Sequence, residues 1–496
     1  MPEPTSVLDS RLRGLTLGLP LVVTLFAFDN LGVTTVMPRV ARDLDGIRLY
    51  GWVFSAFTLA SVVGLVAAGR HADRRGPAPG LTAGLALFVV GLIVTATAPN
   101  MGVVIAGRAL QGLGSGSFGT TMYVVVGRAY PPGLRPRMFA VLSSAWVLPS
   151  LVGPALAGFL ADTVGWRAVF AGLAALAPLP LTMTLPRLRR LVAPAADPGA
   201  ALAADLPVAP AADPAARSAL SSHGPPGPAS PVLLGLGVAA GTAVLLGGLV
   251  ASEWAAFAGL VVAGAAIAGP CLKRVLPPGT GTGRPGIPAA VALRGVLNIA
   301  FFGSDAFIPL LLVRVHHYSA SVAGLPLTAG ALTWTAASWA SGRLRARVGA
   351  AATTAGALVL CAVGISGLIQ SVHYQGALSL GIVSWAVAGF GMGLAYNLVS
   401  LTVVDLSPPG QEGVTAAALQ VTDALGVALG TGIGGALVAL GSRTTWGLAN
   451  PLRVQFSLNA ALALAAVVLA LRLDARRVGG ASGRRGPDRQ PISRVP

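Results

Sequence analysis

GRHADRRG, residues 69–76, is a short basic segment between two long apolar runs, and it decides how this chain is organised. The same frame returns 273 positions later as GRLRARVG, residues 342–349, again between apolar runs. The most informative difference between the two copies is the loss of the acid: the second copy has Ala346 where the first has Asp73. A basic segment that recurs at this distance predicts a chain built from two related halves.

The composition places these halves in a membrane. Of the 496 residues, 54% are hydrophobic and only 10% are charged, and the mean hydropathy is +0.75. Soluble globular proteins do not need so much apolar surface, whereas lipid-facing helices do. Because backbone groups in hydrocarbon must be paired locally, we expect an all-α polytopic membrane protein with about fourteen transmembrane helices. The apolar windows lie at residues 15–38, 50–69, 80–99, 102–127, 137–161, 167–186, 231–250, 254–272, 288–313, 322–342, 352–370, 376–403, 413–440 and 453–472.

The distribution of basic residues predicts the orientation of the spans. A net charge of +17 would suggest nucleic acid binding in a soluble protein, but here the arginines fall mainly in loops, so we expect no nucleic acid partner. With a cytoplasmic N-terminus, most of the 34 basic residues lie on the cytoplasmic side, Arg294 counted among the loops. We therefore expect both termini in the cytoplasm and an even number of spans. Abundant Ala, Gly and Pro, with Lys273 as the single lysine, is typical of GC-rich codon usage and suggests a bacterial plasma membrane.

Pro-rich stretches divide the chain into parts. Residues 191–230 predict a cytoplasmic Pro/Ala-rich linker. The apolar runs at 231–275 match nothing earlier and predict an inserted transmembrane hairpin. They separate an N-terminal six-helix half at 1–190 from a C-terminal six-helix half at 276–474, and a basic cytoplasmic tail follows at 475–496.

Two further matches support the repeat. Asp29 and Asp305, each ahead of a proline in its span, lie 276 positions apart. A glycine ladder in the fourth span returns 277 positions later in the twelfth. Its members are Gly112, Gly114 and Gly116 in the first copy and Gly389, Gly391 and Gly393 in the second.

These residues resemble the major facilitator superfamily, and within it the fourteen-helix drug:proton antiporters, over nearly the whole chain. GRHADRRG is similar to the loop between the second and third helices, although His71 departs from the usual apolar residue. GRALQGLG, residues 107–114, is similar to the Arg-x-x-Gln-Gly-x-Gly motif of the fourth span. LVGPALAG, residues 151–158, is similar to the fifth-span motif associated with antiporters.

The resemblance implies a conformational latch in the first basic segment, formed between half-bundles in one state and broken in another. A carboxylate at Asp73 can pair with arginines and face a helix N-terminus. The alternative is charge that serves topology alone. The candidate latch residues are Gly69, Arg70, Asp73, Arg74 and Gly76.

Ionisable residues inside spans are the candidate proton-coupling and cavity residues. Arg108 is taken as the only arginine deep in a span, and a charge there costs about 2.5–3.5 kcal/mol on insertion scales, so it should meet a partner. The resemblance implies that Arg108 takes part in proton coupling, with Gln111 beside it. The alternative is that Arg108 serves only in a structural ion pair or as a centre of hydrogen bonds. Asp29, Asp305 and Asp423 lie in spans one, nine and thirteen, where removal from water favours the protonated carboxyl. Asp423 could instead be a hydrogen bonder in helix packing.

Gly153, Pro154 and Gly158 allow close helix approach and a kink. The resemblance implies that this kink prevents leak of the empty or wrongly loaded transporter. The alternative is packing alone, which needs the same residues.

Taken together, the resemblance implies a proton-driven exporter of a small amphipathic compound, such as a drug or self-made antibiotic. We expect no enzyme activity and no cofactor, since the proton gradient supplies the energy and no G-x-x-x-x-G-K-[ST] phosphate loop is present. Its partners would be the substrate, protons and the lipid bilayer, with the protein a monomer. The alternatives are a lipid or metabolite exporter, a nutrient:proton symporter, and a non-transporting membrane receptor or scaffold.

The asymmetry of the two basic segments yields a prediction. Asp73→Asn should cripple transport because it removes the latch carboxylate, whereas Ala346→Asp should change it little. Substrate export from cells that express equal amounts of each variant measures both. Equal sensitivity at the two segments would contradict a latch confined to the first half.

Overall fold

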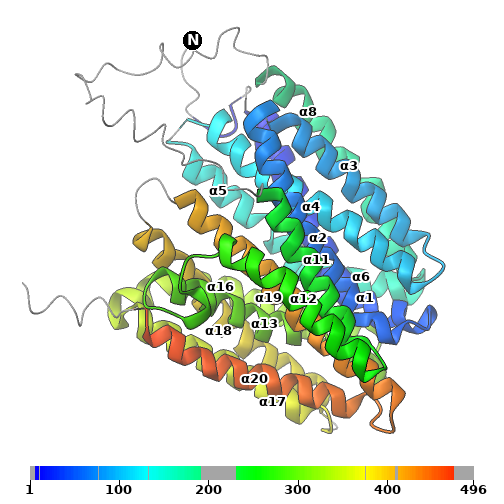
Figure 1. Cartoon of the computed structure of the whole chain (residues 1–496). Helices are drawn as coiled ribbons and strands as arrows, with labels where there is room; N and C mark the ends of the chain where they lie inside the picture. The colour runs from blue at the N-terminus through cyan, green and yellow to red at the C-terminus, as the bar shows by residue number, and fades with distance from the viewer. Residues whose placement is uncertain are drawn as a thin grey trace, which may run out of the picture.

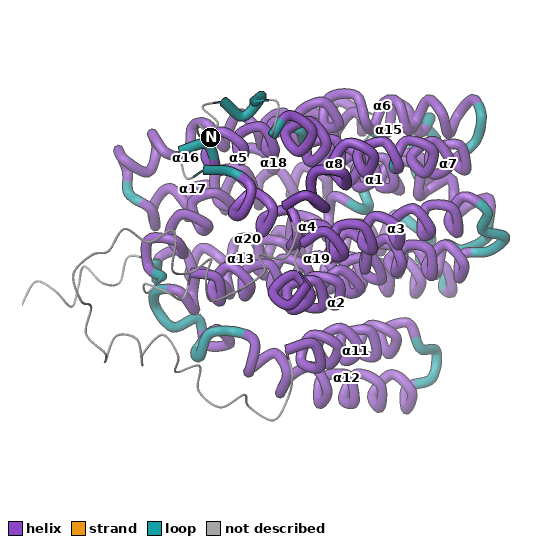
Figure 2. The backbone as a smooth tube through the Cα atoms, turned by 90° about the horizontal axis from the view of Figure 1, so that it is seen from above, coloured by secondary structure: helices purple, strands orange, loops and turns teal. Residues whose placement is uncertain are grey.

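The computed structural model describes residues 6–9, 12–75, 77–131, 133–191, 231–374, 376–407 and 412–473, in which every regular element is a helix (Figures 1 and 2). The first half contains α1 (Arg13–Asp43), η1 (Ile47–Leu49), α2 (Tyr50–Arg75), α3 (Pro77–Ala96), α4 (Met101–Ala129), α5 (Arg135–Ser144), α6 (Val147–Thr163), α7 (Trp166–Leu176) and α8 (Pro178–Leu191). Next come α11 (Pro231–Val250) and α12 (Trp254–Val275). The second half contains η2 (Thr280–Thr282), α13 (Ile287–Asp305), α14 (Ile308–Arg314), α15 (Ala320–Ala323), α16 (Leu325–Val348), α17 (Ala350–Ser371), α18 (Ala377–Leu406), α19 (Glu412–Arg443) and α20 (Ala449–Leu471).

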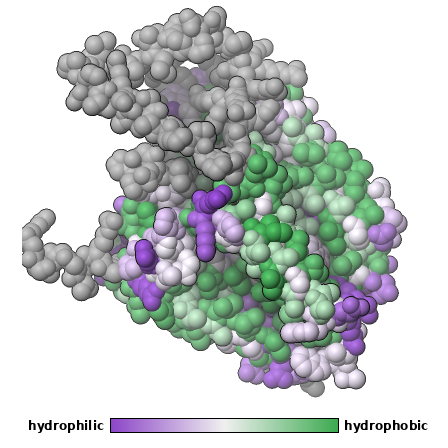
Figure 3. Space-filling model, viewed as in Figure 1, coloured by the Kyte–Doolittle hydropathy of each residue, from purple (hydrophilic) through white to green (hydrophobic). Residues whose placement is uncertain are grey.

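The predicted all-helical polytopic fold with two repeated halves is confirmed. In the described part of the chain, 12 helical segments are long and apolar enough to cross a membrane. Figure 3 shows apolar side chains over the middle of the viewed face and hydrophilic ones toward the helix ends. The predicted linker, apart from Leu191, and the tail lie outside the described residues, and the exact boundaries of the parts remain predictions.

Two expected spans are not among these segments. α4 and α16 have 29 and 24 residues, enough to cross a bilayer, but they are rich in Gly, Ser and Thr. α4 packs against α2 and α3, and α16 packs against α18 and α6. For α4, protein neighbours on two sides take the place that lipid has around more apolar helices, whereas α16 keeps much of its surface exposed. The count of fourteen transmembrane helices stays a prediction.

Three expected spans are each broken into two helices, and proline accounts for the breaks. Pro149 and Pro309 follow the breaks between α5 and α6 and between α13 and α14, and Pro178 begins α8. Proline supplies no backbone N–H and clashes with the carbonyl four residues earlier, so the preceding turn opens.

The basic segments are not loops, contrary to the prediction. α2 continues to Arg75 and α3 begins at Pro77, so residues 69–75 end the second helix. In the second copy α16 continues to Val348, and Gly349, with φ +95°, turns the chain into α17. Because charged side chains can reach the membrane surface from a helix end, a basic segment need not leave the helix. Gly76 and the side chains of residues 69–75 lie outside those described, so the latch remains a prediction.

The glycine ladders confirm the repeat in three dimensions. A Cβ added to Gly112 or Gly116 would meet the backbone of α2, and one added to Gly389 or Gly393 would meet the backbone of α16. Between these positions, Gly114 faces α3 and Gly391 faces α17 in the same way. α4 and α18 therefore occupy equivalent places, each packed closely between two neighbours of its own half.

The inserted hairpin lies at the edge of the bundle, beside α2 (Figure 2). α11 packs on α12, on α2 and on α19, so it contacts both halves. The contact is apolar: Leu59 and Val62 of α2, Val238 and Leu246 of α11, and Leu425 of α19 are buried together. α12 is the least buried of the apolar segments, with 6% of its most apolar window inside the protein.

The ladder generates a prediction about stability. Gly116→Ala places a methyl group against the carbonyl of Ser61, whereas Gly119→Ala, one turn further along α4, meets nothing within 4 Å. Overpacking costs about 1–3 kcal/mol, so Gly116→Ala should lower the thermal midpoint of the detergent-solubilised protein by several degrees. Gly119→Ala should leave it unchanged or raise it slightly, since Ala favours helix. Equal midpoints for both variants would contradict the close approach of α4 to α2.

Candidate functional site

A buried ion pair joins α1 to α4 in the first half. Asp29 is 0% and Arg108 2% exposed, and Nη1 of Arg108 lies 2.7 Å from Oδ2 of Asp29. The guanidinium group also lies over the ring of Phe57 on α2, with its carbon 4.2 Å from the ring centre. Arg108 was predicted to meet a partner, and that partner is Asp29. The pair and the ring of Phe57 connect α1, α2 and α4.

Hydrogen bonds extend this pair into α3. Arg108 donates to the side-chain oxygen of Gln111, whose amide nitrogen donates to the hydroxyl of Thr95 at 3.1 Å. Oδ1 of Asp29 and Nε of Arg108 are buried without a hydrogen-bond partner in the described protein atoms. The structure thus brings together Asp29, Arg108 and Gln111, three of the predicted site residues.

A second buried ion pair, missed in the sequence, lies in the other half. Arg294 of α13 makes two contacts with Asp423 of α19, from Nε to Oδ1 at 2.6 Å and from Nη2 to Oδ2 at 3.2 Å. Its side chain is 4% exposed, and that of Asp423 is 24% exposed. Arg294 is therefore not a loop residue, and the prediction that Arg108 alone lies deep in a span is wrong. The position of Arg294 inside the apolar run that begins at residue 288 is the signal that could have shown it to be buried.

Tyr396 of α18 completes this second cluster. Its hydroxyl donates to Oδ2 of Asp423 at 3.1 Å, and its ring centre lies 3.0 Å from the guanidinium carbon of Arg294. Asn298 adds a hydrogen bond of 2.5 Å to Oδ1 of Asp423. Asp423 is thus neither a lone acid nor a simple packing residue, because it accepts from a cation and two neutral donors.

Asp305 has a different environment from the other two acids. It ends α13, is half-buried, and accepts a hydrogen bond of 3.0 Å from the indole nitrogen of Trp385. None of the ion pairs found in the described residues includes it. Asp305 lies 276 positions after Asp29, and Trp385 lies 277 after Arg108, so these pairs occupy equivalent places in the two halves. In the second half an indole stands where the first half has a guanidinium.

An aromatic cluster joins the two polar groups of the second half. Phe301 stacks on Trp385 with ring centres 4.5 Å apart, and it contacts Trp334 edge-on at 5.6 Å. Trp334 in turn lies 5.3 Å from Tyr396. A continuous aromatic wall therefore runs from Asp305 to Asp423.

The glycine–proline motif of α6 contacts the second half. A Cβ on Gly158 would lie 2.5 Å from the Cα of Ser321 in α15, and Pro154 packs against Gly324. Gly153 faces Phe28 of α1 at ordinary distances. Gly158 and Pro154 thus allow close approach between the halves, in addition to any kink in α6 itself.

Asp162 is a further functional candidate that sequence reasoning missed. It lies 3.2 Å from Nη1 of Arg39, and it accepts hydrogen bonds across the halves from the amide of Ser321 at 3.1 Å and from its hydroxyl at 2.7 Å. The amide of Ala320 lies 3.4 Å away. The acid at the end of an apolar run before Gly165 and Trp166 was the available signal.

Contacts between α2 and the second half gather at this same end of the bundle. Tyr50 donates to the carbonyl of Ala306 at 2.8 Å, and Ser55 donates to the carbonyl of Ala428 at 2.9 Å. Both residues belong to the first turns of α2, far along the helix from its basic end at Arg75. We call this end of the bundle, away from the basic end of α2, the opposite end. The contacts described above join the two halves there.

The described residues include no group of three or more His, Cys, Asp or Glu side chains that could hold a metal ion. The buried polar groups are instead paired acids, arginines, amides and hydroxyls. Such groups can exchange protons or bind a polar part of a small molecule.

Comparison with known proteins agrees with this architecture. The family model of the Major Facilitator Superfamily matches residues 20–222 and 293–495. A protein of Mycobacterium tuberculosis described as a probable multidrug-efflux transporter is 28% identical over 478 residues, which cover 94% of this chain and 96% of that protein.

Solved transporters share the fold at low sequence identity. The crystal structure of a D-xylose-proton symporter has a TM-score of 0.64 at 13% identity and covers 93% of this chain and 97% of that one. A peptide transporter in complex with alafosfalin has a TM-score of 0.63 at 14% identity, with 94% of each chain covered. At these identities the likeness shows the fold alone.

The buried pair of the first half generates a stability prediction. Removing one partner of a buried ion pair typically costs about 3–5 kcal/mol, because the other charge is left uncompensated. Arg108→Gln should therefore lower the thermal midpoint more than the double variant Asp29→Asn with Arg108→Gln. Thermal unfolding of the two single variants and the double variant measures this coupling. Additive effects would show that the two side chains do not depend on each other.

Proposed function

The chain belongs to the Major Facilitator Superfamily, and we propose that it is a proton-coupled exporter of small amphipathic compounds, drugs or a self-made antibiotic among them. It is a multi-pass membrane transporter, not an enzyme, and the relative from Mycobacterium tuberculosis supports efflux as the direction of transport. We place it in a bacterial plasma membrane as a monomer with both termini in the cytoplasm, driven by the proton gradient without a cofactor.

The observation that carries the proposal is the unequal pairing of two equivalent acids. Asp29 faces the permanent charge of Arg108, which stabilises its carboxylate, whereas Asp305 has only the neutral indole of Trp385. When its surroundings change, a half-buried carboxyl without a neighbouring cation gains or loses a proton more readily than a carboxyl that is paired with an arginine. Asp305 is therefore the proposed proton carrier.

Asp29, Arg108 and Gln111 form the proposed coupling group of the first half. Oδ1 of Asp29 and Nε of Arg108 have no protein partner among the described atoms, so this network can exchange partners when the helices move. Asp423, held by Arg294, serves as a cavity acid. In each half an arginine is paired with a carboxylate, while Asp305 is the acid proposed to carry the proton.

The aromatic wall between Asp305 and Asp423 suits an amphipathic substrate. The rings of Phe301 and Trp385 are buried in this state, so they would offer apolar area to a substrate only after the helices around them move apart, with the acids at either end as polar contacts. Binding pockets for small molecules combine such surfaces. Competition between substrate and proton for this region would couple export to proton entry.

Transport then proceeds by alternating access. The halves are joined at the opposite end through Asp162, Gly158 and Tyr50. With both termini in the cytoplasm, as proposed, this would be a state closed toward the outside. Protonation of Asp305 favours rearrangement, and the predicted latch around Asp73 closes the cytoplasmic end in the other state. Gly158 and Pro154 contact the second half at Ser321 and Gly324, so these contacts separate when this end opens.

Proteoliposomes test the proposal with ethidium as the amphipathic probe. Addition of ethidium to liposomes with the wild-type protein should move protons, and a pH gradient should drive ethidium transport. Asp305→Asn should reduce gradient-driven transport to the level of protein-free liposomes but retain ethidium exchange without a gradient, because binding and rocking do not require the proton. Asp405→Asn serves as the matched control, since Asp405 is exposed and pairs with Arg345.

Two results would overturn parts of this proposal. If the wild-type protein transports ethidium without proton movement, antiport is wrong. If Asp305→Asn remains coupled while Asp29→Asn does not, the proton carrier is Asp29.

A further inference from the structure

A pocket separate from the ion pairs lies between the inserted hairpin and α19. Its volume is ≈ 400 Å³, and its walls are the turn from Leu249 to Trp254, Phe257 of α12, and α19 from Ile433 to Arg443. α11 packs against α19 at Leu246 and Gly432, and the pocket opens beyond that contact. None of the site residues above lines it.

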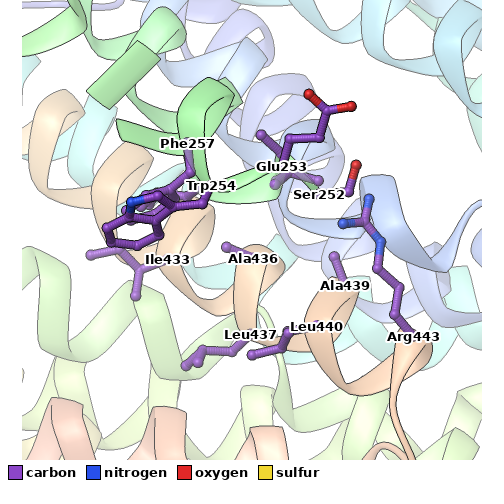
Figure 4. Close-up of a pocket in the computed structure, with 13 residues that line it drawn as sticks. Ser252, Glu253, Trp254, Phe257, Ile433, Ala436, Leu437, Ala439, Leu440 and Arg443 are labelled. Carbon is purple, nitrogen blue, oxygen red and sulfur yellow. The ribbon is translucent and has the colours of Figure 1, made fainter. Parts of the chain in front are cut away.

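The lining changes character along the pocket. Figure 4 shows Ser252, Glu253 and Arg443 gathered on one side, with Trp254, Phe257 and Ile433 on the other. Leu437 and Leu440 continue the apolar wall toward the charged side. The pocket is therefore an apolar groove that ends in one acid and one base.

We expect this pocket to lie near the depth of lipid headgroups, for two reasons. Trp254 begins α12, is 78% exposed and stacks on Phe257. Tryptophan is enriched at this depth because its ring is amphipathic. Arg443 is in the last turn of α19, and both helices are apolar enough to span a membrane.

Glu253 and Arg443 are both exposed where they line the pocket. Neither Glu253 nor Arg443 takes part in an ion pair found among the described residues. Glu253 stands at the N-cap of α12 without a side-chain capping bond. An acid and a base at one pocket mouth complement a ligand that carries both a cation and an anion.

We propose that this groove binds a phospholipid with a primary ammonium headgroup, of the phosphatidylethanolamine type, from the leaflet at the opposite end. Arg443 pairs with its phosphate, Glu253 accepts a hydrogen bond from its ammonium group, and the start of an acyl chain lies along Ile433, Leu437 and Leu440. An anionic lipid would leave Glu253 facing negative charge, and a choline headgroup has no N–H to donate.

The site has a structural consequence for the hairpin. α12 touches mainly α11, so one side of the hairpin lacks protein neighbours near α19. A lipid in the groove fills that space. It would thereby hold the hairpin against α19, the helix that contacts α2 across the two halves.

Native mass spectrometry of the purified, detergent-solubilised protein tests the site. The lipids are phosphatidylethanolamine, phosphatidylcholine and phosphatidylglycerol with identical acyl chains. The wild-type protein should retain phosphatidylethanolamine in preference to the others. Arg443→Gln should weaken its retention about tenfold, the ratio that corresponds to 1.4 kcal/mol and to the loss of one charge-assisted hydrogen bond.

A second variant tests the ammonium contact. Glu253→Gln should abolish the preference for phosphatidylethanolamine over phosphatidylglycerol while phosphate binding through Arg443 continues. Arg453→Gln is the matched control, because Arg453 is another exposed arginine at the same end but lies on α20, outside the groove. Equal thermal midpoints for all variants establish that each is folded.

Several results would overturn the proposal. For the wild-type protein, these are equal retention of the three lipids or a preference for phosphatidylglycerol. For the variants, they are unchanged binding of phosphatidylethanolamine by Arg443→Gln or unchanged selectivity of Glu253→Gln. A lipid-free dimer lost in Arg443→Gln would assign the groove to a second copy of the chain.

Discussion

Hydrocarbon gives a guanidinium group no water to bond with, so an arginine inside a membrane must find its acceptors on neighbouring helices. Arg108 and Arg294 meet this requirement in the two halves of the chain. Arg108 draws α1, α2 and α3 around α4 through Asp29, Phe57 and Gln111. Arg294 does the same for α13, α18 and α19. The close glycine contacts of α4 and α18 bring the helices near enough for these bonds to form.

The halves share this architecture but distribute their charges differently. In the first half the cation sits on the central helix α4, and in the second it sits on α13, at the position of a first helix. The place equivalent to Arg108 is then free for Trp385. One displaced arginine thus leaves Asp305 without a cation and produces an aromatic surface beside it. The two halves of one repeated fold thus carry two unlike polar sites.

Apolar length, the glycine ladders and the repeated basic segments were sufficient to predict the helical fold, because these features depend on local sequence. The pairing of Asp29 with Arg108 was only partly predictable, since the sequence shows that a buried charge needs a partner but does not say which. Arg294 was counted with the basic residues of the loops, although it lies as far inside α13 as Arg108 lies inside α4. Asp162 escaped notice because two of its partners are backbone amides of the other half, which no side-chain pattern reveals.

Those backbone amides have a consequence for substitutions at the contact between the halves. Two of the groups that bind Asp162 belong to the main chain of α15, and substitution of Ala320 or Ser321 leaves a backbone N–H in place. Substitution of Ser321 by a non-proline residue therefore removes only the hydroxyl bond to Asp162 and keeps the backbone bonds, whereas a change at Asp162 removes all of them together. The polar part of the contact between α6 and α15 thus depends more on the one side chain of Asp162 than on the identity of the residues that it binds.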